Sequence, residues 1–93
     1  MIMHVTIHHP DPEKTGGMVD ALHRFEGQIR SQPGVLSVHT LKDSHTGALV
    51  SLAVWQSKDS WLSAQAAMIR AETDVDLSTW ESQPPMVYHL EEI

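Results

Sequence analysis

The sequence contains no cysteine, no long apolar run and few basic residues. Without cysteine, the chain cannot form disulfides, use a thiolate nucleophile or bind zinc or iron–sulfur clusters through cysteine. The six lysines and arginines are scattered and the formal net charge is −6, so we expect no nucleic-acid partner. No segment approaches the roughly 20 apolar residues of a membrane helix, and the N-terminus MIMHVTIHH lacks a basic leader region. We therefore predict a soluble, cytoplasmic protein without a membrane partner.

The composition is that of an ordinary globular protein. Of the 93 residues, 41% are hydrophobic and 19% are charged, which is too apolar for a disordered chain. We predict a single domain over residues 1–93. Because a chain this short buries a smaller fraction of its surface than a longer one does, additional burial through self-association is expected.

The first third of the chain predicts a strand followed by a helix. Residues 2–8 alternate between apolar side chains and histidine or threonine, which is typical of a strand. In residues 17–31 apolar side chains recur at helical spacing, and Thr15 is a candidate N-cap. Pro33 and Gly34 are expected to end this helix.

A hairpin is expected next, with strands over residues 35–42 and 48–55. If residues 43–47 form the whole loop, residue 42 pairs with 48, 40 with 50 and 38 with 52. One face of the hairpin is then nearly aliphatic and carries Leu36, Val38, Thr40, Val50, Leu52 and Val54. The other face carries Val35, Ser37, His39, Leu41, Leu49, Ser51, Ala53 and Trp55.

The rest of the chain predicts a helix, an irregular segment and a final strand. Ser57 is a candidate N-cap for a helix reaching about residue 71, with Asp59 in its first turn. The buried stripe of this helix is expected to contain Trp61, Leu62, Ala64, Met68 and Ile69. Residues 72–83 are mostly polar and acidic, and Trp80 is expected to anchor them to the body of the protein. Residues 86–90 alternate again, and the two preceding prolines suit a strand at a sheet edge.

The resulting order is βαββαβ, which predicts an α+β, ferredoxin-like fold with a four-stranded antiparallel sheet. Both helices of such a fold cover the same face of the sheet. The aliphatic face of the hairpin would then remain exposed to water, which favours aggregation. The simplest solution is that two copies pack these faces together, so the pattern itself predicts a homodimer.

Three stretches are the most distinctive part of the sequence. They are PGVLSVHTLKD from residue 33, GALVSLAVW from residue 47 and WQSKDSW from residue 55. With a helix ending in Pro-Gly and a strand closing on Trp-x-Ser, the chain resembles the antibiotic biosynthesis monooxygenase family. The resemblance implies a dimeric α/β barrel in which each subunit has a pocket between its sheet and helices. It also implies oxidation of quinol-like or anthrone-like aromatics by dioxygen, without metal or flavin cofactors, although other members degrade haem.

Residue by residue, the resemblance is incomplete. Trp55 matches the pocket-lining tryptophan of the anthrone-oxidising type. Ser51 stands where that type has an asparagine that holds the substrate, and Trp61 stands where it has a tyrosine. The haem-degrading type needs an asparagine on the first strand and a histidine late in the second helix, and this sequence has neither. Haem degradation of that kind is therefore disfavoured.

These matches lead to a site hypothesis. His39 is the candidate catalytic base, because the expected register places it opposite Ser51 on the helix-facing side. Trp55 and Trp61 are candidates to stack on a flat aromatic substrate, with Ser51 as a further substrate-binding residue. Under the alternative interpretation, both tryptophans only pack in the core and His39 is a half-buried histidine without a catalytic role.

Seven histidines raise the question of a metal site. His4 and His8 share a face, but the intervening strand separates them by roughly 13 Å, too far for one ion. A site would need a cross-strand meeting of His39, His4 or His89, and we predict no metal.

Two functions remain open. The first is a cofactor-independent monooxygenase acting on a small aromatic substrate. The second is a non-catalytic dimeric α/β barrel that binds a ligand or has a structural role. A continuous cavity between sheet and helices that opens to solvent and reaches His39 would favour the enzyme.

Overall fold

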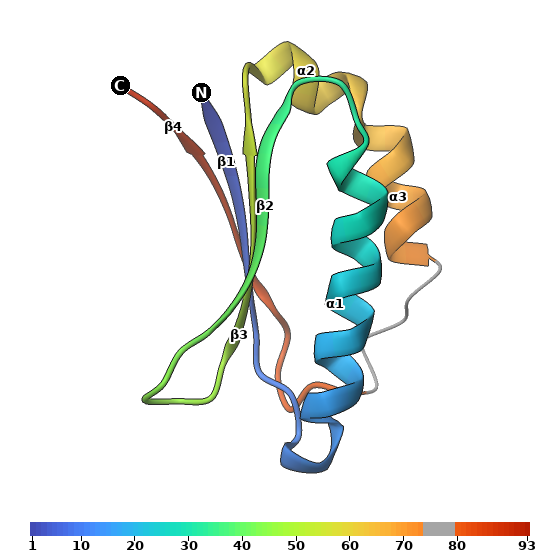
Figure 1. Cartoon of the computed structure of the whole chain (residues 1–93). Coiled ribbons are helices and arrows are strands. Elements are labelled where there is room, and N and C mark those ends of the chain that lie inside the picture. Colours follow the sequence, from blue (N-terminus) through green and yellow to red (C-terminus); the bar gives the residue numbers. More distant parts are fainter. Residues whose placement is uncertain (74–79) are drawn as a thin grey trace.

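A four-stranded antiparallel sheet carries all of the helices on one of its faces in the computed structural model, which describes residues 1–73 and 80–93 (Figure 1). The strands are β1 (Ile2–His8), β2 (Val35–Lys42), β3 (Leu49–Trp55) and β4 (Met86–Glu91). The helices are η1 (Pro12–Lys14), α1 (Thr15–Arg30), α2 (Lys58–Ser63) and α3 (Gln65–Thr73).

The strand order β2-β3-β1-β4 is that of the ferredoxin-like fold, as predicted. β1 pairs with β3 on one side and with β4 on the other, and both pairings are antiparallel. β4 lies at the edge of the sheet, which confirms the position inferred from the two prolines before it.

Helix α1 begins earlier than predicted, and Thr15 is its first residue rather than its N-cap. The short helix η1 precedes it directly, with Pro12 in its first position. Proline favours that position because its fixed φ is already helical. At the other end, Gly34 has a φ of +85° and reverses the chain toward β2, as expected.

The second helical region is divided into α2 and α3 at Ala64. Ser57 is the N-cap as predicted, since its hydroxyl accepts a hydrogen bond from the Ser60 amide at 3.1 Å. Ala64 and Met68 are buried, but Leu62 and Ile69 are 50% and 60% exposed, so their predicted burial is wrong. The break at Ala64 changes the direction of the chain. The buried stripe predicted for one continuous helix is therefore wrong on both sides of the break.

Among the described residues, two clusters form the core between sheet and helices. The larger consists of Ile2, Ile29, Val38, Trp55, Ala64 and Met68. The smaller consists of Met18, Leu22 and Leu49, with Val19 and Trp80 packed against it. The position of Trp80 confirms that this tryptophan anchors the segment preceding β4, while residues 74–79 lie outside the described part of the chain.

The predicted register of the hairpin is wrong by one residue, because its loop has six residues instead of five. The Asp43 carboxylate accepts hydrogen bonds from the His45 amide at 3.0 Å and from the Thr46 hydroxyl at 2.7 Å. The Ala48 amide in turn donates to the Thr46 hydroxyl at 3.2 Å. These bonds keep Ala48 in the loop, so Lys42 pairs with Leu49.

This shift reverses the faces of most of β2. Val38 pairs with Ala53 and Thr40 with Ser51, which places both β2 residues on the side of the helices. His39 pairs with Leu52 on the opposite side. A β-bulge between residues 35 and 37 returns the pairing of Val35 and Trp55 to the predicted register.

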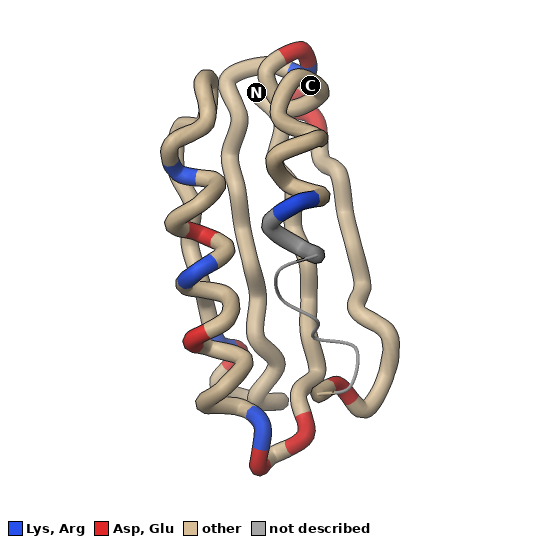
Figure 2. The backbone as a smooth tube through the Cα atoms, turned by 90° about the vertical axis from the view of Figure 1, so that its right-hand side faces the viewer, with Lys and Arg blue, Asp and Glu red and all other residues tan. Residues whose placement is uncertain are grey.

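The face of the sheet away from the helices is called here the open face. It carries the apolar residues Met3, Val5, Ile7, Leu41, Val50, Leu52, Val54, Met86, Tyr88 and Leu90. Charged residues lie along the helices and in the connections, and within the strands only Lys42 and Glu91 are charged, each at a strand end (Figure 2). Apart from Ser37 and His39 of β2, the open face is therefore a continuous apolar surface.

Candidate functional site

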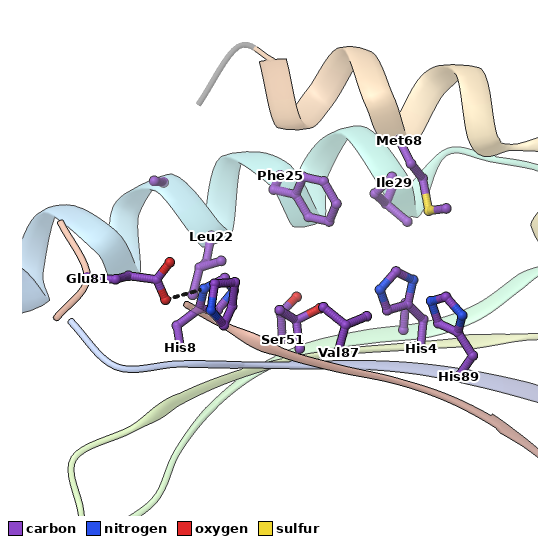
Figure 3. Close-up of a pocket in the computed structure, with 14 residues that line it drawn as sticks. His4, His8, Leu22, Phe25, Ile29, Ser51, Met68, Glu81, Val87 and His89 are labelled. Carbon is purple, nitrogen blue, oxygen red and sulfur yellow. Dashed lines mark hydrogen bonds and ion pairs between the residues drawn. The ribbon is translucent and has the colours of Figure 1, made fainter. Parts of the chain in front are cut away.

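A cavity of about 500 Å³ lies between the sheet and helices α1 and α3. Its helix side is apolar and includes Leu22, Phe25, Ile29 and Met68 (Figure 3). Val87 of β4 also lines it and is 53% exposed, so the cavity opens to solvent beside the edge strand. The space has the size and apolar character of a small-molecule pocket.

The sheet side of the cavity is polar. Alternation along β1 directs His4, Thr6 and His8 toward the helices, while the residues between them belong to the open face. Thr6 pairs with Ser51 of β3, so two hydroxyl groups lie near the middle of the cavity. Histidines occupy both ends of this polar row (Figure 3).

At one end, His8 and Glu81 form a buried pair. The His8 Nδ1 atom lies 2.9 Å from Glu81 Oε1, and the side chains are 9% and 4% exposed. The His9 amide donates a second hydrogen bond to the same carboxylate oxygen at 3.3 Å. An ionised carboxylate only accepts hydrogen bonds, so with Glu81 ionised the donor in this contact is Nδ1 of His8.

At the other end, His4 and His89 pair across β1 and β4 with ring centroids 4.7 Å apart. The ring of Trp61 lies 4.7 Å from that of His89 and 6.3 Å from that of His4. Burial, together with the neighbouring His89, lowers the pKa of His4 from its usual value. Both effects favour the neutral form of the His4 imidazole.

His39 does not lie in this cavity. It is exposed on the open face, and Thr40 occupies the place opposite Ser51 that the expected register assigned to His39. The residues lining the cavity do not include it. The geometric reason for choosing His39 as the base is therefore wrong, and the cause is the additional loop residue.

The three predicted substrate-binding residues lie in three different environments. Ser51 lines the cavity. Trp55 is fully buried within the larger core cluster and is not among the lining residues. Trp61 packs beside the same cluster and borders the cavity only through its contacts with His4 and His89.

Sequence reasoning considered His4, His8 and His89 only as metal ligands and did not consider Glu81 as a site residue. The alternation of β1 puts His4 and His8 on one face of the strand, but only the pairing of β1 with β3 shows that the helices cover this face. Glu81 had no such signal, since it contacts His8 across 73 positions of the chain. His89 became relevant only through the pairing of β1 with β4.

Within the described part of the chain, no group of three or more histidine, aspartate or glutamate side chains has the geometry of a metal site. The meeting of His4 and His89 supplies two imidazoles. None of the helices in the described ranges is long and apolar enough to cross a membrane.

A ferredoxin-like sheet with a pocket beneath its helices defines the class to which this protein belongs. The sequence pattern of the antibiotic biosynthesis monooxygenase family matches residues 1–68. The chain belongs to the antibiotic biosynthesis monooxygenase family. Family membership agrees with the resemblance inferred from the hairpin and the Trp-x-Ser sequence. A comparison with curated proteins found no match to the chain.

Solved structures show the same fold at low sequence identity. Rv0793 from Mycobacterium tuberculosis has a TM-score of 0.85 and 14% identity, over 99% of this chain and 94% of that one. A candidate antibiotic biosynthesis monooxygenase from Nitrosomonas europaea has a TM-score of 0.82 and 12% identity, over 100% and 99%. A conserved protein from Methanosarcina mazei has a TM-score of 0.84 and 13% identity, over 99% and 92%. At these identities the similarity establishes the fold alone.

Proposed function

We propose that this protein is a cofactor-independent monooxygenase that oxidises a small quinol-like or anthrone-like aromatic in the cavity between sheet and helices. The observation that carries this proposal is the cavity itself, with its apolar helix side and its row of hydroxyl and imidazole groups on the sheet side. Pockets for small aromatic molecules combine these two properties, because apolar walls bind the rings and a few polar groups orient them.

For this oxidation the protein must position the substrate, accept a proton and exclude water. For an anthrone, a base first removes a C–H proton, and the carbanion then transfers its electrons to dioxygen to form a carbon-bound peroxide. Transfer of the second proton from that carbon to the distal oxygen breaks the O–O bond and leaves a carbonyl group and hydroxide. The hydroxide and the first proton form water, so one oxygen atom enters the product and the other leaves as water.

Ser51 is the binding residue that the geometry supports best, because its side chain lines the cavity beside Thr6. A hydroxyl group can donate a hydrogen bond to the oxygen of a bound quinol or anthrone. Trp55 supports the site from the core, behind the cavity wall, and Trp61 supports it through His4 and His89. We therefore assign stacking on the substrate to Phe25, which lines the cavity directly.

Ligand binding without oxygenation is the second candidate function. It is favoured by Ser51, which occupies the position where the anthrone-oxidising type has an asparagine. A serine hydroxyl is shorter than an asparagine amide and offers fewer hydrogen-bond donors to a developing anion.

We also propose that the protein acts as a homodimer in the cytoplasm. The open face supports the dimer, because its apolar side chains come from all four strands and helices cover only the opposite face (Figure 1). A monomer would expose an unusually large apolar patch, which a second copy of the same surface would bury. Family membership supports this assembly as well.

The decisive assay measures dioxygen consumption with a panel of quinols and anthrones. We expect turnover by the wild type and a loss of roughly tenfold or more in Ser51→Ala, since a substrate hydrogen bond in a desolvated site is worth about 1–2 kcal/mol. Ser63→Ala, an exposed serine on α2, is the matched control and should retain wild-type turnover. Saturable binding of the same compounds without dioxygen consumption would instead establish the ligand-binding function.

A further inference from the structure

His8 and Glu81 form a pair whose position is not explained by the stability of the fold. Removing a carboxylate and an imidazole from water costs several kcal/mol, and an apolar pair of similar volume often stabilises a protein as well or better. Here both side chains are almost completely buried, and both line the cavity. Their location in the cavity is therefore the feature that requires an explanation.

The pair is also not needed to attach the segment that contains Glu81. The Asp11 amide donates to the Trp80 carbonyl at 2.8 Å, and the Ser82 amide donates to the His9 carbonyl at 3.0 Å. In addition, Trp80 packs against the cluster formed by Met18, Leu22 and Leu49. These contacts fix the backbone on both sides of Glu81 without any contribution from its carboxylate.

We propose that His8 is the proton-accepting catalytic residue of the cavity and that Glu81 is its positioning residue. The carboxylate of Glu81 binds the protonated Nδ1, which leaves the lone pair of the neutral imidazole on Nε2. Among the side chains described, those of residues 1–70 and 80–93, none forms a hydrogen bond with Nε2. The assignment deepens the proposed oxygenation and rests on it for the identity of the substrate.

The proton transfer is simple. An acidic O–H or C–H group of a bound aromatic gives its proton to Nε2, the substrate becomes an anion and the imidazole becomes an imidazolium. The negative charge of Glu81 then lies 2.9 Å from the imidazolium and stabilises it. A carboxylate that orients a histidine base in this way fixes both the tautomer and the direction of the ring.

The histidines at the opposite end of the cavity are less suitable for this role. Burial and the neighbouring His89 lower the pKa of His4, which makes its imidazole a poorer proton acceptor than a free histidine. Among the described residues, the rings that contact His89 are those of His4 and Trp61, and neither supplies a negative charge. Among the described side chains, His8 is the cavity histidine with a carboxylate partner.

The first test determines the tautomer of His8 by long-range ¹H–¹⁵N correlation NMR of the wild-type protein, with the ring assigned through its own backbone. We expect the form protonated on Nδ1 at neutral pH. A ring protonated on Nε2 alone could not accept a proton from the cavity and would overturn the proposal. This measurement requires no variant to fold and no substrate.

The second test uses 4-nitrophenol as an acidic aromatic probe, because its phenolate is yellow. We expect the protein-bound phenol to ionise at a pH lower by roughly one unit or more than the free phenol, as a nearby cation favours the anion. The shift should decrease in Glu81→Gln and disappear in His8→Gln. His23→Gln, an exposed histidine on α1, is the control and should keep the wild-type shift. An equal shift in His8→Gln, or no shift in the wild type, would overturn the proposal.

The two proposals can fail separately. If the tautomer and the phenol shift are as expected but no quinol or anthrone consumes dioxygen, the oxygenase proposal fails and the base assignment stands. If dioxygen consumption occurs and is unchanged in His8→Gln, the oxygenase proposal stands and the base assignment fails.

Discussion

Trp55 and Ser51 are only four positions apart on β3, yet they have different roles. Both side chains point toward the helices, but Trp55 is fully buried in the core whereas Ser51 borders the cavity. The difference arises because Ile29, Val38 and Met68 enclose the end of the strand. At the scale of single residues, burial therefore separates a core residue from a cavity-lining residue, proposed to bind substrate, on the same face.

Replacing Trp55 should mainly lower the stability of the folded protein, because its side chain packs in the core and does not line the cavity. We expect Trp55→Ala to lower the free energy of unfolding by about 3–5 kcal/mol, through lost burial and the cavity it leaves. Urea unfolding monitored by circular dichroism measures this change. Leu62→Ala is the control, because Leu62 is 50% exposed and its truncation should cost less than about 0.5 kcal/mol. A Trp55→Ala protein as stable as wild type would contradict the packing role.

His4 should make the stability of the protein depend on pH. The folded protein lowers the pKa of His4 below its usual value of 6.5, so the unfolded chain binds this proton more readily. The resulting stability is present above pH 6.5 and is lost as the pH falls from there toward the folded pKa. The groups facing His4 are His89 of β4 and the ring of Trp61.

We expect His4→Gln to show a smaller loss of unfolding free energy between pH 7 and pH 5 than wild type. Urea unfolding at a series of pH values measures the difference. His23→Gln on the exposed side of α1 should retain the wild-type dependence. If His4→Gln loses stability as steeply as wild type, the proton uptake occurs at another group.

At the scale of elements, the sequence predicted helices and strands correctly where a capping residue, a turn glycine or a regular alternation marks them. The Ser57 cap, the positive φ of Gly34 and the alternation of β1 all act within a few residues, and the structure contains each of them. The hairpin loop differs because its length depends on side-chain hydrogen bonds. Asp43 and Thr46 keep Ala48 out of β3, and one residue is enough to exchange the faces of β2.

Removing the cap of α2 should weaken that helix measurably. Ser57→Ala removes the acceptor for the Ser60 amide, and we expect the free energy of unfolding to fall by about 1 kcal/mol. Thermal and urea unfolding both report this change. Ser63→Ala is an exposed serine replacement at the end of the same helix, and it should cost less than about 0.5 kcal/mol. Equal effects of the two substitutions would argue against the cap.

At the scale of the whole molecule, the two faces of the sheet lie in different environments. The helix side contains the core and the cavity, and the open face contains the apolar residues proposed to form the dimer. Leu52 lies on β3, the second strand from one edge, and is paired with Val5 and His39. Its side chain is therefore well placed to test the interface.

Sedimentation equilibrium at micromolar concentration should give twice the chain mass of 10.4 kDa. Leu52→Glu should reduce the mass to that of one chain, because a carboxylate buried in an apolar interface would lose its hydration without a partner. Leu62→Glu places the same charge on the exposed side of α2 and should leave the dimer intact. A wild-type protein that sediments as a single chain would contradict the role of the open face.

The amino-acid sequence determined the order of the elements, the ferredoxin-like arrangement and the existence of an apolar face on the sheet. These features follow from periodicity, capping and turn residues, which act over a few positions of the chain. Only the tertiary structure decided which histidines face the cavity. His8 and Glu81 are 73 positions apart, and the orientation of His39 depends on one loop residue. Contacts between distant segments have no local signal in a sequence, because they form only when the sheet brings those segments together.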